Sequence, residues 1–159
     1  EMGQSLIDGI GRSPGRAVLI DHDHTEMTYA VALQMATRFD QITLVTSRER
    51  IANDVSLINR QNILQRLFDH DIEHICHAEP DSLDGLEAGR LMIKNVYNDK
   101  VSELSDVVTV VHASSRLPNQ YLLKPLRANG LEVIPIGDCR APRSLMAATH
   151  EGYHIANTL

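Results

Sequence analysis

The sequence predicts an α/β domain with a doubly wound, mostly parallel sheet. Short runs of branched apolar residues alternate with amphipathic helical stretches, and this alternation is typical of such a sheet. The first unit spans residues 17–46, with a strand at 17–20, a helix that ends near Arg38 and a second strand at 42–45. Its length of about 30 residues suits a right-handed βαβ crossover, which places the two strands side by side and parallel.

The later elements continue this alternation with one interruption. Residues 55–71 show helical periodicity, residues 72–76 alternate as a strand, and a loop follows around Pro80, Asp81 and Gly85. The remaining expected elements are a hairpin of residues 89–96 and 100–104, a strand at 107–111, a helix at 119–129, a strand at 131–136 and a helix at 142–158. A β-hairpin inserted after three parallel strands is typical of a Rossmann-like nucleotide-binding half.

Composition limits the class of protein and its partners. The chain has 159 residues, of which 43% are hydrophobic and 23% charged, and this is ordinary globular composition. A net charge of −6, 4% aromatic residues and no Trp argue against a nucleic-acid partner. No apolar run reaches the roughly 20 residues of a membrane helix, and no signal peptide is evident. We therefore expect no membrane partner. The two cysteines, Cys76 and Cys139, lie far apart in the sequence, which favours the reducing cytoplasm over a disulfide scaffold.

The first turn between strand and helix carries carboxylates where a dinucleotide-binding domain has glycines. Residues Asp21 to Glu26 read Asp-His-Asp-His-Thr-Glu. Glycines let the backbone approach a pyrophosphate at the helix N-terminus, whereas carboxylates there cost several kcal/mol against a diphosphate. The turn therefore predicts a degenerate phosphate loop. Arg48 and Arg50 follow the second strand; they would favour a 2′-phosphate in an intact site, but solvated loop arginines are the interpretation we favour.

Two later runs resemble a known group of flavoproteins. Residues 107–119 resemble the "ATG-x-x-PN" strand and turn of flavoprotein reductases with two dinucleotide-binding domains, with Ser115 in place of the glycine. Residues 133–143 and 147–152 contain Gly-Asp-Cys-Arg-Ala-Pro-Arg and then Ala-Ala-Thr-His-Glu-Gly. This form resembles the trimethylamine dehydrogenase and 2,4-dienoyl-CoA reductase group of old-yellow-enzyme-related (NADH:flavin oxidoreductase) flavoproteins, in their C-terminal region. The resemblance covers residues 4–159.

The resemblance implies a set of cofactor-binding residues and a division of the chain. In the family, the Asp of this motif meets the ribityl or ribose-phosphate part of a dinucleotide, and the helix start faces the phosphates. The residues that match are Gly137, Asp138, Ala141 and Pro142. The implied division is a linker at 1–16, an NAD(P)-binding-like half at 17–131, and a strand and helix at 132–159 that return to the FAD- or ADP-binding half.

Full-length members of the group also carry a TIM barrel with FMN, a 4Fe–4S cluster and a glycine-rich first dinucleotide half. Two cysteines cannot ligate such a cluster, and no GxGxxG is present. We therefore expect part of an oxidoreductase resembling trimethylamine or other N-methylamine dehydrogenases, structural or acceptor-docking and inactive alone. Its expected partners are upstream domains of the same parent chain and an electron-transfer flavoprotein. The alternatives are the NADPH-binding half of a dienoyl-CoA-reductase-like enzyme and a non-catalytic structural or docking module.

Histidine and cysteine offer further candidate sites. The chain has eight histidines, and His150 and His154 are spaced i, i+4, which lets two imidazoles share one helix face. The only adjacent candidate for a third ligand is Glu151, which lies on a different face of the helix, so we expect surface histidines and no metal site. Cys139 precedes a helix start, which lowers the pKa of a thiol. A reactive thiol and a buried small hydrophobe are both compatible with its position, and we favour the second. No catalytic residue is assigned.

Overall fold

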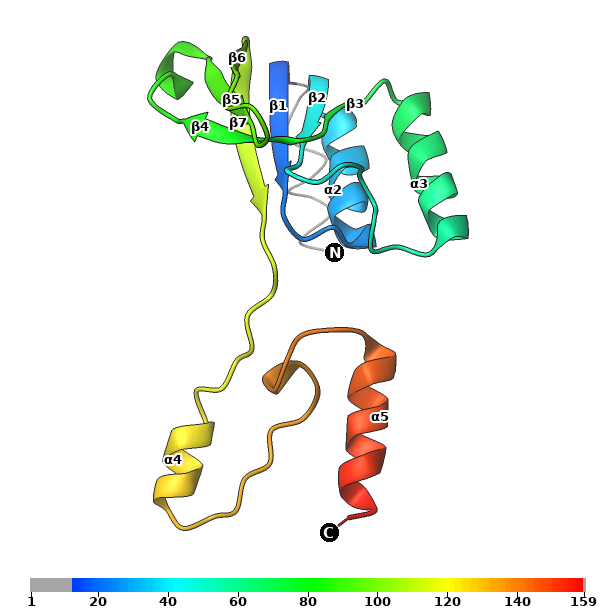
Figure 1. Cartoon of the computed structure of the whole chain (residues 1–159), viewed down its shortest axis with the longest axis vertical. Coiled ribbons are helices and arrows are strands. Elements are labelled where there is room, and N and C mark those ends of the chain that lie inside the picture. Colours follow the sequence, from blue (N-terminus) through cyan, green and yellow to red (C-terminus); the bar gives the residue numbers. More distant parts are fainter. Residues whose placement is uncertain (1–12, 159) are drawn as a thin grey trace. The chain divides into compact units, whose positions relative to one another are not determined.

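The structure is a computed structural model that describes residues 13–158 (Figure 1). It divides into two compact units, with the boundary between Ser114 and Ser115. The first unit contains β1 (Ser13–Asp21), α2 (Glu26–Ala36), β2 (Phe39–Val45), α3 (Leu57–Asp69), β3 (Glu73–Ile75), β4 (Ala78–Ser82), η1 (Leu86–Ala88), β5 (Leu91–Asn95), β6 (Val101–Leu104) and β7 (Val107–Ala113). The second contains α4 (Leu123–Ala128), η2 (Gly137–Cys139) and α5 (Leu145–Ala156).

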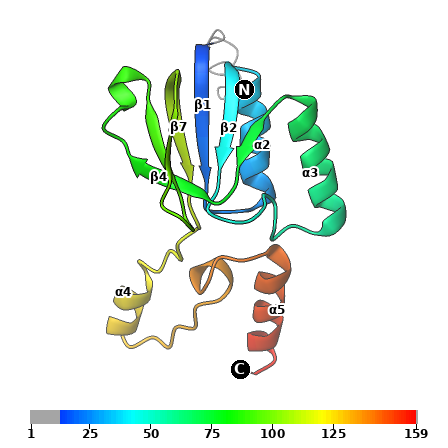
Figure 2. The same cartoon turned by 45° about the horizontal axis from the view of Figure 1, so that its top comes forward.

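A parallel sheet of four strands forms the centre of the first unit, in the order β3-β2-β1-β7. Strands β1, β2 and β7 run side by side in Figure 2, with α2 and α3 on one side of them. The expected Rossmann-like α/β fold is confirmed. The predicted linker needs correction at its end: residues 1–12 lie outside the described part of the chain, but residues 13–16 belong to β1.

The inserted antiparallel element is larger than the predicted hairpin. Strands β5 and β6 form that hairpin, and β4 adds a third strand to β5. We expected a loop around Pro80, and this expectation was wrong because β4 is an edge strand. Proline lacks the N–H that a central strand needs, but an edge strand tolerates it. Pro80 lies opposite Ile93 in the ladder.

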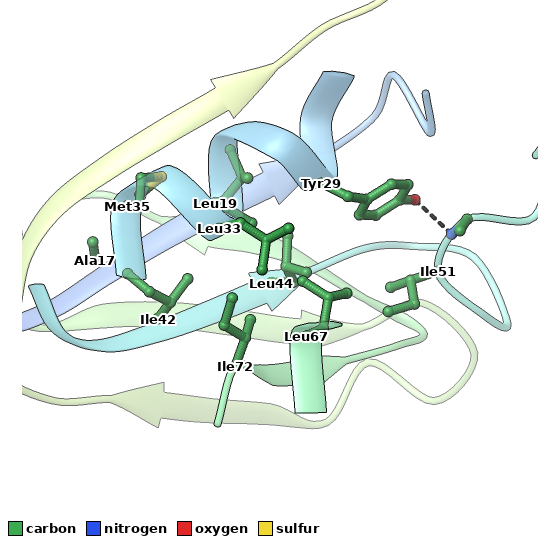
Figure 3. Packing of buried hydrophobic residues seen from close by; sticks show 12 residues of the cluster. Ala17, Leu19, Tyr29, Leu33, Met35, Ile42, Leu44, Ile51, Leu67 and Ile72 are labelled. Carbon is green, nitrogen blue, oxygen red and sulfur yellow. Dashed lines mark hydrogen bonds between the residues drawn. The ribbon is translucent and has the colours of Figure 1, made fainter. Parts of the chain in front are cut away.

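Two apolar clusters flank the parallel sheet, because successive side chains of a strand point to opposite faces. Leu19 and Leu44 are at most 1% exposed and pack on one face with residues of α2 and α3 (Figure 3). Val18 and Ile20 lie on the opposite face, in a cluster with residues of β4, β5 and β6. Helices thus cover one face of the sheet, and the antiparallel strands cover the other.

The second unit differs from the prediction in one strand and two helix starts. Residues 131–136 form no strand, and the part of this unit that the structure describes contains no other strand with which they could pair. Helix α5 begins after Ser144, whose side chain accepts the Ala147 N–H, rather than near Pro142. Helix α4 likewise begins later than residue 119, but it ends before Gly130, whose φ of +75° fits the predicted glycine stop.

Candidate functional site

The first turn after β1 satisfies its own backbone with a buried carboxylate. Asp21 is fully buried at the end of β1. Its Oδ1 accepts the backbone N–H of His24 at 2.8 Å, and its Oδ2 accepts the Tyr29 hydroxyl at 2.7 Å. In a phosphate loop, backbone N–H groups of this turn are offered to the ligand. Here the His24 N–H is already bonded to a negative group of the protein.

Tyr29 extends this network to the loop after β2. Its hydroxyl accepts the backbone N–H of Ala52 at 2.5 Å, which is the dashed line in Figure 3. Both residues are fully buried. Burial, and then the bond to Asp21, raises the pKa of Tyr29 well above its usual range, so the phenol remains a donor. The side chain therefore fixes the end of β1, the start of α2 and residue 52 relative to one another.

The other two carboxylates of the turn also have partners within the unit. Asp23 Oδ2 accepts the Thr25 hydroxyl and, at 3.4 Å, the Thr28 hydroxyl. Glu26, at the first position of α2, accepts the side-chain amide of Asn59 at 2.6 Å. The acidic turn is thus an internally bonded structure, and its interpretation as a degenerate phosphate loop stays a prediction.

Arg48 and Arg50 lie in the loop after β2, as predicted, and both have carboxylate partners. Arg48 Nη1 is 3.0 Å from Asp54 Oδ1, and Arg50 donates to the neighbouring Glu49. Their side chains are 42% and 55% exposed. This pairing matches the interpretation of solvated loop arginines.

Two histidines meet at the carboxyl ends of β1 and β7. His22 Nδ1 lies 2.8 Å from His112 Nε2, and their rings are perpendicular with centroids 4.9 Å apart. Desolvation lowers the pKa of His22, and the nearby His112 and His24 lower it further. A cavity of about 430 Å³ borders the pair. Within residues 13–158, no three or more His, Cys, Asp or Glu side chains are arranged to hold a metal ion.

The second candidate site is the turn formed by η2, which holds the predicted residues Gly137 and Asp138. Gly137 has a φ of +58°, a region that favours glycine. Its N–H donates to Glu151 Oε2 at 2.8 Å. A Cβ at this position would lie 3.2 Å from the Ala148 Cβ, so the turn is packed tightly against α5.

The Asp138 carboxylate contacts two arginines but remains exposed to solvent. Its Oδ1 accepts the Arg143 N–H at 3.4 Å, and its Oδ2 lies 3.5 Å from Arg116 Nη1. The Asp138 side chain is still 60% exposed. The Ala141 N–H donates to the Gly137 carbonyl at 3.0 Å, and Pro142 follows in the segment before α5. The four predicted cofactor-binding residues are therefore neighbours in one turn, and what they bind stays a prediction.

Four residues in or around this turn were assigned no role there by sequence reasoning: Arg116, Arg140, Arg143 and Glu151. Arg116 donates from Nη2 to the Arg143 carbonyl at 2.7 Å, and Glu151 accepts from Arg143 and from Arg140. The sequence showed Glu151 as part of the family-like motif and as a candidate ligand beside His150 and His154, but not as a partner of this turn. The expectation of a buried Cys139 was wrong, because this residue, the last of η2, is exposed.

Comparisons with known proteins agree with this description of the fold. No family model matches the sequence, and no curated protein matches it. Histamine dehydrogenase from Rhizobium sp. 4-9 matches 98% of this chain with 24% of its own, at 24% identity and a TM-score of 0.79. The 6-hydroxypseudooxynicotine amine oxidase from Pseudomonas geniculata N1 matches 95% with 23% of its chain, at 19% identity and a TM-score of 0.77.

Two further structures extend the comparison. A 2-naphthoyl-CoA reductase matches 91% of this chain with 21% of its own, at 19% identity and a TM-score of 0.67. Thioredoxin reductase from Lactococcus lactis matches 97% with 55% of its chain, at 18% identity and a TM-score of 0.66. This chain spans about a quarter or less of the first three proteins. The chain therefore shares the Rossmann-like fold of one segment of histamine dehydrogenase and its structural relatives, which confirms the predicted resemblance at the level of fold.

Proposed function

We propose that the chain is part of a cytoplasmic flavin-dependent oxidoreductase resembling trimethylamine or other N-methylamine dehydrogenases. In this proposal it supports assembly or contact with an electron acceptor, and it has no turnover alone. FMN, a 4Fe–4S cluster and FAD or ADP belong to the parent enzyme; two cysteines do not fit the cluster. The structural likeness to histamine dehydrogenase and to an amine oxidase supports this class of enzyme.

The observation that carries the proposal is the bonding of Asp21. A dinucleotide at the first turn would need the His24 N–H, which this carboxylate accepts at 2.8 Å. It would also bring a diphosphate toward a fully buried negative group whose other oxygen is bonded to Tyr29. Breaking these bonds would leave buried polar groups unpaired, which costs about 1–3 kcal/mol for each group. The turn is therefore built for structure and not for a nicotinamide cofactor.

The second unit carries the surface that the proposal assigns to assembly. Residues 131–136 are apolar except for Glu132 and lack a strand partner within the described part of this unit. A groove of about 310 Å³ lies between them and α4. The exposed large apolar residues here are Leu117, Tyr121, Leu122, Leu131, Ile134, Ile136, Leu145, Met146 and Tyr153. Exposed apolar surface of this extent marks a contact surface. Upstream domains of the same parent chain are the partner that we propose for it.

A titration tests the assignment of the first unit. The chain is titrated with NADPH and NADH by isothermal calorimetry, and we expect no stoichiometric binding. Tight binding of NADPH at a one-to-one ratio would contradict the proposal. It would favour the alternative of an NADPH-binding half of a 2,4-dienoyl-CoA-reductase-like enzyme, in which hydride enters through this unit.

A second experiment separates the remaining alternative. Immobilised chain is exposed to a purified electron-transfer flavoprotein, and bound protein is measured against a variant with Leu145 and Met146 changed to Ser. These two side chains are 85% and 68% exposed. Specific capture by the chain alone would favour a docking module. The parent class itself is tested by the encoding sequence upstream of residue 1, where we expect a barrel, a cysteine cluster and a GxGxxG motif.

A further inference from the structure

We infer that Glu151 is the positioning residue of the Gly137–Asp138 turn: it fixes the direction in which Asp138 presents its carboxylate to a ligand hydroxyl. The ligand part of this inference rests on the proposed function. The positioning part rests only on contacts within the second unit, and it concerns a residue to which neither the motif resemblance nor the fold comparison gives a role.

The first contact is made through the backbone. Glu151 Oε2 accepts the Gly137 N–H at 2.8 Å, and Gly137 is in the left-handed region at a φ of +58°. Ala148 and Glu151 are three residues apart on α5, so they share a helix face. This face supplies a small residue that lets the turn approach and an acceptor that bonds its free N–H. Any rotation of the turn would break that bond or bring it against Ala148.

The second set of contacts is made through charge. Glu151 Oε1 lies 3.2 Å from Arg140 Nη1 and also pairs with the Arg143 guanidinium. Arg143 in turn donates its backbone N–H to Asp138 Oδ1 at 3.4 Å, and its carbonyl accepts from Arg116. Arg143 therefore links the two carboxylates: its side chain pairs with Glu151, and its backbone N–H donates to Asp138. Glu151 thus acts on both ends of the turn.

The exposure of the two carboxylates separates their roles. The Glu151 side chain is 16% exposed, whereas that of Asp138 is 60% exposed. A bond from the Gly137 N–H, followed by the arginines, lowers the pKa of Glu151 below its ordinary value. Glu151 is consequently charged and engaged with the protein at neutral pH, while Asp138 keeps an open face for a ligand.

The test follows the Gly137 amide resonance of the chain by NMR between pH 7 and acid pH. We expect the amide shift to titrate with a midpoint below that of an ordinary glutamate. In Glu151→Gln the acceptor oxygen remains and the charge is lost, so the titration step caused by Glu151 should disappear and leave only the response to the neighbouring Asp138, while the amide stays protected from exchange. In Glu151→Ala both are lost, and exchange of this amide should accelerate by at least about tenfold, the effect of one hydrogen bond.

Glu132→Gln is the matched control, because Glu132 is an exposed glutamate of the same unit. It should leave the Gly137 titration and exchange unchanged. The same titration midpoint in Glu151→Gln as in the native chain, or a Gly137 amide that exchanges equally fast in all variants, would overturn the inference. The circular dichroism spectrum of the chain checks that each variant is folded. Because the readout needs no ligand, its failure is distinct from a failure of the proposed function.

Discussion

Tyr29→Phe removes one oxygen atom and breaks two buried hydrogen bonds. The hydroxyl donates to Asp21 at 2.7 Å and accepts from Ala52 at 2.5 Å, and all three residues are fully buried. Loss of a bond to a carboxylate costs about 1.5–3 kcal/mol, and an unpaired buried N–H costs about 1–3 kcal/mol. We expect the free energy of unfolding to fall by about 3 kcal/mol, since the ring itself stays packed. This is a large part of the stability of an ordinary domain, about 5–15 kcal/mol.

The assay is urea denaturation of the chain, followed by circular dichroism. With a slope of about 1.5 kcal/mol per molar urea, the transition midpoint of the first unit should fall by about 2 M. Tyr97→Phe is the control, because it makes the same chemical change in the same unit on a side chain that is 77% exposed. Equal and small effects of the two substitutions would refute the reasoning, because they would mean that the Asp21–Tyr29–Ala52 network adds nothing to stability.

Three further predictions concern the strand ends, a helix start and the core. The lowered pKa of His22 means that the folded state binds fewer protons than the unfolded state at this residue. The contribution of His22 to stability is therefore fully present above about pH 6.5 and is lost as the pH falls below it. The drop in urea midpoint between pH 7.5 and 5.5 should be smaller in His22→Asn than in the native chain. Ser144→Ala removes the cap that accepts the Ala147 N–H at 3.2 Å and should cost about 1 kcal/mol, measured as faster amide exchange in the first turn of α5. Leu44→Ala in the core should cost about 3 kcal/mol in urea denaturation, whereas Ile58→Ala, on a side chain that is 74% exposed, should cost less than about 0.5 kcal/mol.

The elements predicted best from the sequence are those whose pattern depends on burial alone. The buried parts of β1 and β2, residues 17–20 and 42–45, are almost entirely apolar because helices cover one face of their sheet and antiparallel strands cover the other. Strand β4 escaped prediction because Pro80 is tolerated only through its place at a sheet edge, which a sequence does not reveal. The strand expected at residues 131–136 is absent for a related reason. Its mostly apolar pattern suits a strand, but a strand needs a neighbouring strand to pair with, and the described part of the second unit has none.

The candidate sites show a similar limit. The sequence indicated that carboxylates at the first turn disfavour a diphosphate, but nothing in it revealed that Asp21 is bonded to Tyr29, eight residues later. That bond needs the first turn of α2 to fold back over the end of β1. Likewise, Gly137 and Asp138 are evident from their motif, whereas the action of Glu151 depends on α5 lying against the turn. Residue identity predicts the chemistry of each site, and only packing reveals which partner uses it.

The turn after β1 and the turn at η2 share one kind of hydrogen bond but differ in whether a carboxylate is left exposed. In each, a carboxylate of the protein accepts a backbone N–H that a ligand would otherwise take: Asp21 accepts that of His24, and Glu151 accepts that of Gly137. At the first turn the accepting carboxylate, Asp21, is buried in the core, so a ligand hydroxyl could reach it only by breaking its bonds to His24 and Tyr29. At the turn of η2, Glu151 of α5 accepts the Gly137 N–H, and the side chain of Asp138, the residue after Gly137, is 60% exposed. In the proposed function, a ligand hydroxyl would therefore meet an exposed carboxylate at Asp138, whereas Asp21 is buried and bonded within the protein.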